Sequence, residues 1–178
     1  MSALKNPHRH DDLLNYRLKR LLTAGGAPAI RLCEGGYGVS RQEWRLMAAL
    51  VESGPLSPTE LAERASVEPA RVARVVQSLA GKQLVARVEI PGDRRRAQLA
   101  ATQQGKALYR ELLPQLAGIN RRLMEVLSEE ESVLLDQFLQ RLIARADAIQ
   151  AEGGGVDVKT RRYLGGAGRV PARAHDKV

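Results

Sequence analysis

The stretch from Leu84 to Thr102 constrains the fold of this chain more than any other part of the sequence. It contains two strand-like runs, about 84–90 and 96–102, joined by a tight turn that carries Asp93, Arg94 and Arg95. Because two short helix patterns precede it directly, the region predicts a helix-turn-helix followed by a hairpin with a basic tip. Such a unit presents a helix that fits the major groove of DNA and an arginine that fits the adjacent minor groove. The sequence therefore predicts binding to double-stranded DNA.

Three helix starts carry the S-x-x-E pattern of a capping box, in which two free amide donors are satisfied reciprocally. The pairs are Ser40 with Glu43, Ser57 with Glu60, and Ser128 with Glu131. The first two predict helices over about 40–53 and 58–65, and Pro69 opens the next helix after a brief turn. These local signals predict where the helices of the DNA-binding unit begin.

The helix that begins at Pro69 has one apolar side and one polar side. Apolar residues recur at i, i+3, i+4 and i+7, which predicts a buried stripe of Val72, Val75, Val76 and Leu79. The outward positions are Ala70, Arg71, Arg74, Gln77 and Ser78. This polar side is the predicted surface for DNA, and a solvated charged face is the alternative.

Specific roles follow from the chemistry of these side chains. An arginine at position 71 or 74 can bond guanine O6 and N7 or grip phosphate, while Gln77 can read adenine or touch the DNA backbone. Ser57 and Thr59 are expected to help cap the preceding helix and to contact phosphate.

The hairpin tip carries the basic residues predicted to enter the minor groove. An arginine in the narrow, negative minor groove gains from focused potential and from displaced counterions. Asp93 is expected to pair with a neighbouring arginine and hold the shape of the loop. The residues alone do not decide whether Arg94, Arg95 or Arg96 inserts, and the alternative is that all three only solvate the tip.

Composition supports a polyanionic partner. Among 178 residues, 28 Lys and Arg against 20 Asp and Glu give a formal net charge of +8, which favours nucleic acid or an anionic membrane, or simply keeps the chain soluble.

No apolar run approaches the ~20 residues of a membrane span, and residues 1–12 lack a signal-peptide core. The single cysteine, Cys33, excludes an intramolecular disulfide and fits a reducing compartment. We therefore expect a cytoplasmic location.

The remaining helices carry more apolar surface than one small domain covers. A helix over about 11–24 is interrupted by Gly25, Gly26 and Pro28, which predicts a kink or two separate pieces. A long helix from about 108 to 126 has Pro114 as a candidate bend, and the last helix follows Ser128. Exposed apolar helix faces of this size indicate a partner subunit, so we expect a homodimer.

The sequence resembles the MarR family of bacterial transcriptional regulators over roughly residues 11–150. The resemblance rests on 39–50 and 56–64 as the second and third helices, on Leu79, Leu84, Val85 and Arg87 at the transition to the wing, and on Asp93-Arg94-Arg95, Thr102, Gly105 and Lys106. It implies a mainly α fold with a small β-hairpin: a winged helix-turn-helix flanked by N- and C-terminal dimerisation helices. Two departures are Gln83, where the family usually has glycine, and the break at 25–28.

The resemblance also implies domain limits and a function. The expected parts are 1–38 for N-terminal dimerisation, 39–104 for the winged helix-turn-helix, 105–150 for the C-terminal dimerisation helices, and 151–178 for a basic, disordered tail. Family members commonly repress transcription at palindromic operators and are released by small phenolic or aromatic acids, or by oxidation. The family pattern favours Arg95 as the wing arginine that enters the minor groove.

An effector pocket is expected, by resemblance, where the dimerisation helices meet the DNA-binding lobe. Tyr16, Tyr37 and Trp44 would supply its apolar walls, and His8, Arg17 and Arg20 would meet a carboxylate. The alternatives are a core role for Trp44 and solvation for the two arginines.

Other functions have less support in the residues. Cys33 is a candidate oxidation sensor or a small buried hydrophobe. The His8-x-His10-Asp11-Asp12 sequence is a weak metal signal, so neither a metal nor a cofactor is expected. No Ser/His/Asp order, phosphate-cradling loop or paired carboxylates indicate an enzyme. A non-specific architectural DNA binder and a module for membrane surfaces or protein partners remain as alternatives.

Overall fold

The computed structural model describes residues 2–90 and 93–152, and for residues 90 and 93–97 it describes the backbone alone. The chain divides into two compact units, Met1–Val126 and Leu127–Val178. Of the predicted tail, 151–178, Ala151 is the last residue of a helix, and residues 153–178 lie outside the described residues.

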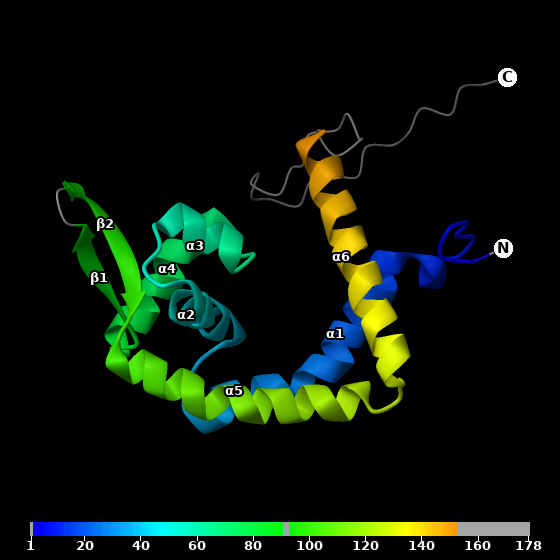
Figure 1. The fold of residues 1–178 in the computed structure, drawn as a ribbon, viewed down its shortest axis with the longest axis horizontal. Coiled ribbons are helices and arrows are strands. Elements are labelled where there is room, and N and C mark those ends of the chain that lie inside the picture. Colours follow the sequence, from blue (N-terminus) through cyan, green and yellow to red (C-terminus); the bar gives the residue numbers. More distant parts are fainter. Residues whose placement is uncertain (1, 91–92, 153–178) are drawn as a thin grey trace, which may run out of the picture. The chain divides into compact units, whose positions relative to one another are not determined.

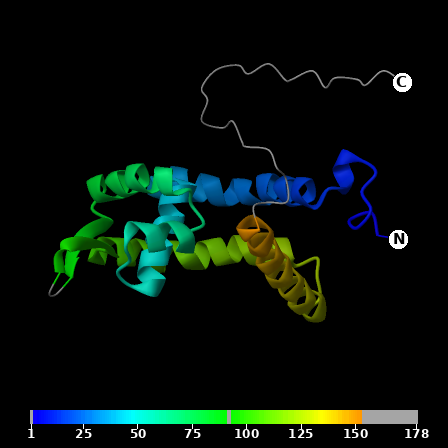
Figure 2. The ribbon, with the colours of Figure 1, turned by 90° about the horizontal axis from the view of Figure 1, so that it is seen from above.

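The first unit contains all but one of the described helices and the only described hairpin (Figure 1). Its elements are η1 (His10–Asp12), α1 (Leu14–Arg31), the π-helical turn η2 (Leu32–Gly36), α2 (Arg41–Ser53), α3 (Pro58–Arg64), α4 (Pro69–Gly81), β1 (Val85–Ile90), β2 (Asp93–Ala101) and α5 (Gln103–Met124). Figure 2 shows the hairpin at one end of α5. The second unit contributes α6 (Glu129–Ala151). The fold is mainly α with a small β-hairpin, as predicted.

All three predicted capping boxes are confirmed. In each, the serine Oγ accepts a hydrogen bond from the backbone N–H three residues later, and the glutamate carboxylate accepts from the serine N–H. The backbone N of Ser40 lies 2.6 Å from Glu43 Oε2, for example. Thr102 caps α5 through a bond from the Gly105 N–H to its hydroxyl at 3.0 Å. Side-chain to backbone hydrogen bonds within one turn therefore determine these four helix starts.

The core of the first unit lies between α2, α4, α5 and the hairpin. Its most deeply buried side chains are Val39, Leu46, Met47, Leu50, Leu61, Leu79 and Leu112. The predicted stripe on α4 is buried at Val72, Val75 and Leu79, whereas Val76 is half-buried and lines a cleft. One face of α4 is thus attached to the core, and the opposite face stays outside.

The hairpin differs from the prediction at its tip. The strand β2 begins at Asp93, so residues 93–95, predicted as a turn, belong by backbone to the strand. Glu89 pairs with Ala97 but Ile90 pairs with Asp93, which places a register shift opposite residues 94–96. A shift of this kind bends and twists a strand near its end. Leu56 also pairs with Leu99 through two backbone hydrogen bonds of 3.0 and 2.8 Å, a bridge the sequence did not indicate.

Of the two alternatives predicted for the first helix, the one with two separate pieces is wrong. Helix α1 is continuous from Leu14 to Arg31 through Gly25, Gly26 and Pro28, and only then changes to the π-helical turn. The glycines serve packing, because a Cβ on Gly25 would lie 3.2 Å from Leu123 of α5 and one on Gly26 would lie 3.3 Å from the guanidinium of Arg41. Helix α5 likewise continues through Pro114.

Gln83 occupies the left-handed region of backbone space, with φ of +58°. Only glycine adopts this conformation without a steric penalty, and the residue is exposed, so its side chain contributes little packing. We expect Gln83→Gly to stabilise the protein by about 1 kcal/mol in urea unfolding. Ser66, with φ of +48°, offers a parallel substitution to glycine with the same expected sign. A loss of stability in both variants would contradict this explanation.

Candidate nucleic-acid interface

The outer face of α4 presents a compact set of side chains to solvent. Ala70, Arg71, Arg74 and Gln77 are all exposed, opposite the buried stripe. Arg71 Nε lies 3.3 Å from the carboxylate of Glu68, one turn earlier, so this guanidinium is partly held in place. Among the side chains that the structure describes, Arg74 forms no ion pair. Arg74 is therefore the cation on this face that can turn to a ligand at the lowest cost.

The start of α3 lies near this face. Ser57 is half-buried and its hydroxyl accepts from the Glu60 N–H at 3.3 Å, while Thr59 is exposed. Pro58, between them, lines the same cleft as the side of α4. The capping role expected for Ser57 is confirmed, and its contact with phosphate stays a prediction.

The predicted wing residues lie in β2, beyond the last regular pair of the hairpin. Asp93 pairs by backbone with Ile90, and Arg94, Arg95 and Arg96 fall within the register shift. Their side chains lie outside the described part of the structure, so the pairing of Asp93 and the choice of inserting arginine stay predictions.

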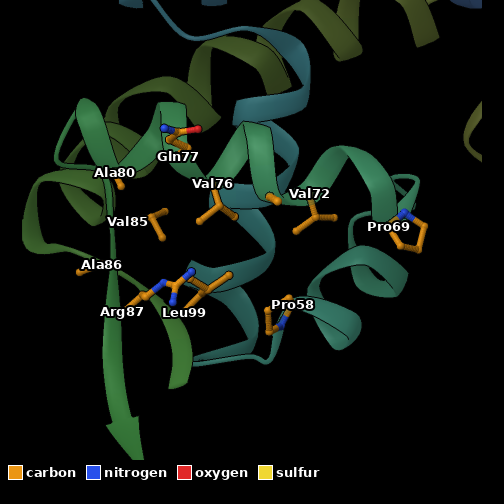
Figure 3. Close-up of a pocket in the computed structure, with 11 residues that line it drawn as sticks. Pro58, Pro69, Val72, Val76, Gln77, Ala80, Val85, Ala86, Arg87 and Leu99 are labelled. Carbon is orange, nitrogen blue, oxygen red and sulfur yellow. The ribbon is translucent and has the colours of Figure 1, made fainter. Parts of the chain in front are cut away.

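A cleft of about 680 Å³ separates α4 from the hairpin. Figure 3 shows Val72 and Val76 of α4 on one side, Val85 and Leu99 on the other, with Arg87 beside Leu99. Arg87 is a basic residue to which the sequence analysis assigned no contact. The sequence could have indicated this position, because residues two apart on a strand lie on the same face. Arg87 follows Val85, which is buried, by two residues. The side chain of Arg87 therefore places a positive charge at the cleft between α4 and the hairpin.

An ion pair with one buried partner lies at the C-terminal end of α4. Glu43 of α2 is 5% exposed, and its carboxylate oxygens lie 2.7 and 2.8 Å from Lys82 Nζ. It also accepts from Ser78 Oγ at 2.7 Å. Ser78 is exposed, as predicted, but its hydroxyl is used within the protein. Burial alone raises the pKa of Glu43, but the bonds from Lys82, Ser78 and Ser40 outweigh it and lower the pKa to about 2.

The low pKa of Glu43 predicts a specific acid sensitivity. The ordinary value is 4.5, so the contribution of the charge to stability, about 3 kcal/mol, is complete above pH 4.5 and is lost as the pH falls through 2. About 2 kcal/mol of it should be gone by pH 3. We expect urea unfolding of the wild type to show this loss and Glu43→Gln to lack it. Parallel pH profiles for the two proteins would exclude the assignment.

Comparison with known proteins identifies the family. Residues 37–96, from the residue after η2 into β2, match the sequence model of the MarR family. The repressor MdtR of Bacillus subtilis is 31% identical over 110 residues, which cover 62% of this chain and 71% of MdtR. The chain belongs to the MarR family of transcriptional regulators. Such regulators bind DNA and act as dimers.

Solved structures agree with this assignment. Ligand-free NadR is 25% identical, with a TM-score of 0.67 over 78% of this chain and 98% of NadR. NadR in complex with 4-hydroxyphenylacetate, also 25% identical, has a TM-score of 0.62 over 75% of this chain and 95% of NadR. The MarR-family winged helix-turn-helix is therefore the frame of this interface.

One copy of the MarR-family chain does not bring the predicted effector residues together. His8, Tyr16, Arg17 and Arg20 lie before or within the first turns of α1, whereas Tyr37 and Trp44 follow its other end. The 18 residues of α1 span about 27 Å. Figures 1 and 2 both show the start of α1 well away from α2.

The N-terminal members of this set have local partners. Arg17 donates to the backbone oxygen of Asp11 at 2.7 Å and pairs with the carboxylate of Asp12 at 3.3 Å. The rings of His10 and Tyr16 lie 4.2 Å apart, and Arg20 and His8 are exposed. A carboxylate ligand would have to compete with Asp12 for Arg17.

The other two members contact α5. Tyr37 donates to Glu111 at 3.0 Å and also accepts from Gln115. Trp44 stacks on Tyr109 with ring centroids 5.5 Å apart and planes at 10°. The bond from the Tyr109 hydroxyl to Glu52, together with burial, raises the pKa of Tyr109 to about 12. The sequence analysis missed Tyr109, because no local pattern links it to a tryptophan 65 positions earlier.

Cys33 behaves as a small core residue. It is 3% exposed within the π-helical turn, and burial, aided by Glu34, raises the pKa of its thiol. An oxidation sensor needs the opposite, an accessible thiol with a lowered pKa. The environment of Cys33 therefore favours the structural alternative.

Two kinds of feature are absent from residues 2–90 and 93–152. Within these ranges, no three His, Cys, Asp or Glu side chains are grouped as metal ligands, at the N-terminal histidines or elsewhere. In the same part of the chain, every helix is too short or too polar to cross a membrane.

Proposed function

We propose that this MarR-family protein is a sequence-specific transcriptional repressor that binds a palindromic operator as a homodimer. The observation that carries the proposal is the exposed face of α4, where Arg71, Arg74 and Gln77 stand opposite a buried stripe and beside an arginine-bearing hairpin. The relative MdtR is named a repressor, which supports the direction of control. The chain would act in the cytoplasm, where the chromosome lies.

In this proposal α4 enters the major groove. Arg74 bonds a base edge or phosphate, Arg71 and Gln77 flank it, and Ala70 approaches at the first turn. Ser57 and Thr59 at the start of α3 contact one phosphate backbone. Arg87 contacts the DNA strand that passes between α4 and the wing.

Exposed apolar side chains support the dimer. On α1 and α5 they include Leu21, Leu22, Leu113 and Leu123, and α6 exposes Phe138, Leu142 and Ile143 among others. Helix faces of this kind are covered by a partner in stable assemblies. Two copies would place two α4 helices about one helical turn of DNA apart, which makes the operator a palindrome.

The wing arginine is tested by Arg95→Ala. Removal of a minor-groove arginine and one phosphate-neutralising charge should weaken operator binding at least ~10-fold in a gel-shift titration at fixed salt. The variant should remain a folded dimer, because the residue lies at the hairpin tip, away from the core. Arg94→Ala and Arg96→Ala serve as matched controls with smaller expected losses. Equal affinity of Arg95→Ala and wild type would refute the assignment.

A small aromatic or phenolic acid is the proposed effector. NadR was solved with 4-hydroxyphenylacetate, and this chain has the aromatic residues Trp44 and Tyr37 at the junction of α2 and α5. Because one copy keeps Tyr16, Arg17, Arg20 and His8 too far away, these residues would have to come from the second copy. The effector would favour a dimer whose recognition helices are wrongly spaced for DNA.

The effector proposal is tested with 4-hydroxyphenylacetate and a panel of hydroxylated benzoic acids. At least one compound should raise the Tm and release the protein from its operator, and Arg20→Ala should weaken that release without weakening DNA binding. Release of DNA by none of them would remove this class of effector, while the DNA-binding proposal would stand.

A further inference from the structure

The ammonium group of Lys82, at the C-terminal end of α4, is saturated with partners. Its Nζ lies 2.7 Å from the backbone oxygen of Gly38, 2.7 Å from Glu43 Oε1 and 2.8 Å from Glu43 Oε2. An ammonium has three N–H donors, so all of them are used within the protein. The Lys82 ammonium is therefore bonded within the protein although its side chain is 38% exposed, whereas Arg74 of α4 forms no ion pair among the described side chains.

Glu43 collects bonds from separate segments of the chain. Besides Lys82, its carboxylate accepts from Ser78 Oγ of α4 at 2.7 Å and from the N–H of Ser40 at 2.6 Å. Among the described residues, Glu43 is the only charged one that is buried. One carboxylate thus connects the first turn of α2 to the last turn of α4, and through Lys82 to the loop after η2.

An ion pair between a buried carboxylate and a partly exposed ammonium is not explained by stability alone. The desolvation of Glu43 offsets part of the attraction, and solvent around the 38% exposed Lys82 side chain screens it further. Hydrogen bonds depend on direction, whereas apolar packing does not. The side chains of Val72, Val75 and Leu79 hold α4 against the core, but contacts between aliphatic groups do not define its rotation sharply.

We propose that Glu43 and Lys82 are positioning residues for DNA recognition, which set the rotation and tilt of α4 from its C-terminal end. The proposal rests on the proposed function, in which α4 reads the operator. The bonds at Ser78 and Lys82 lie one turn apart at the C-terminal end of α4, so together they fix the rotation of the helix about its own axis. This rotation decides whether Arg71, Arg74 and Gln77 point at the base edges. The bond to Gly38 extends this control to the end of α1, since that loop follows η2.

The test compares Lys82→Met and Glu43→Gln with Lys106→Met, a control that removes an exposed lysine from α5. Spin labels at Ala70→Cys in a Cys33→Ala background report the distance between the two α4 helices of the dimer without DNA. We expect Lys82→Met to broaden this distance distribution and to lower affinity for a selected operator at least tenfold. Affinity for unrelated DNA at the same salt should stay within twofold of the wild-type value, because attraction to phosphates does not require a fixed rotation of α4. The double variant should lose no more than the single ones, since the two residues act as a unit.

Conservative variants separate positioning from folding. Lys82→Arg keeps the charge but not the geometry of the ammonium group, so it should remain folded and still lose operator preference. A folded Lys82→Met or Lys82→Arg dimer with the wild-type distance distribution and operator affinity would overturn the proposal.

Arg74→Ala, measured in parallel, distinguishes failure of this proposal from failure of the proposed function. If Arg74→Ala keeps full operator affinity, α4 does not read DNA, and the premise of the positioning role falls with the proposed function. If Arg74→Ala loses affinity while Lys82→Met changes neither distance nor affinity, only the positioning role is wrong.

Discussion

Replacement of Arg74 by alanine should lower operator affinity at least 30-fold while leaving the dimer folded. Arg74 is exposed in the middle of α4, and the adjacent buried positions, Val72 and Val75, are unaffected by its removal. A bidentate contact between arginine and guanine contributes roughly 1–3 kcal/mol of discrimination. A dimer loses two such contacts, so a loss of about 2 kcal/mol, or roughly 30-fold, is the lower limit.

The matched control is Arg110→Ala, which removes an exposed arginine from α5. Its effect on affinity should be less than threefold, because any loss would come only from net charge. Fluorescence anisotropy with a selected operator at fixed salt measures both variants. Equal losses in the two would mean that Arg74 contributes charge alone and that α4 is not the reading helix.

Gly105→Ala should cost about 2–3 kcal/mol of stability, near the upper end of the range for overpacked sites. A Cβ at this position would lie 2.2 Å from the backbone oxygen of Leu84 and 3.2 Å from its carbonyl carbon. The same oxygen accepts a hydrogen bond from the Thr102 N–H at 3.0 Å, so it cannot move aside freely. The first turn of α5 and the start of β1 would have to separate.

Thermal unfolding measures this effect, with an expected fall in Tm of roughly 5–10 °C. Gly81→Ala is the matched control, because a Cβ there would meet no atom within 4 Å and the backbone does not have a positive φ. That variant should equal or exceed the wild-type Tm. A Gly105→Ala protein as stable as the Gly81→Ala protein would show that α5 is not packed against Leu84 in this way.

Local chemistry made much of the fold predictable. The capping boxes of Ser40, Ser57 and Ser128 are complete within four residues, so the starts of α2, α3 and α6 follow from sequence alone. The polar face of α4 follows equally from a pattern within one helix. Gln83 also revealed its backbone conformation, because the family usually has glycine there and its φ is indeed positive.

The features that failed depend on contacts between distant segments. Gly25 and Gly26 are helix breakers by local preference, but close packing on Leu123 and Arg41 keeps α1 continuous. The hairpin tip was misread because a register shift, rather than turn residues, decides where β2 begins.

The partners of the candidate site escaped prediction for the same reason. Glu43 was assigned only a capping role, although it also holds Lys82, 39 positions away. Trp44 was placed in a ligand wall without Tyr109, its stacking partner. Which residues lie on a surface can be read from periodicity, whereas which residues meet across helices cannot.

The central claim is that this chain reads DNA sequence with α4. The most direct measurement selects a binding site from a random DNA pool and then compares affinity for that site and for its scrambled version at one salt concentration. The account predicts at least a ~10³-fold preference for the selected site, together with an enriched palindrome whose half-sites lie about one helical turn apart. Equal affinity for both duplexes, with no enriched sequence, would contradict it and indicate a non-specific architectural DNA binder.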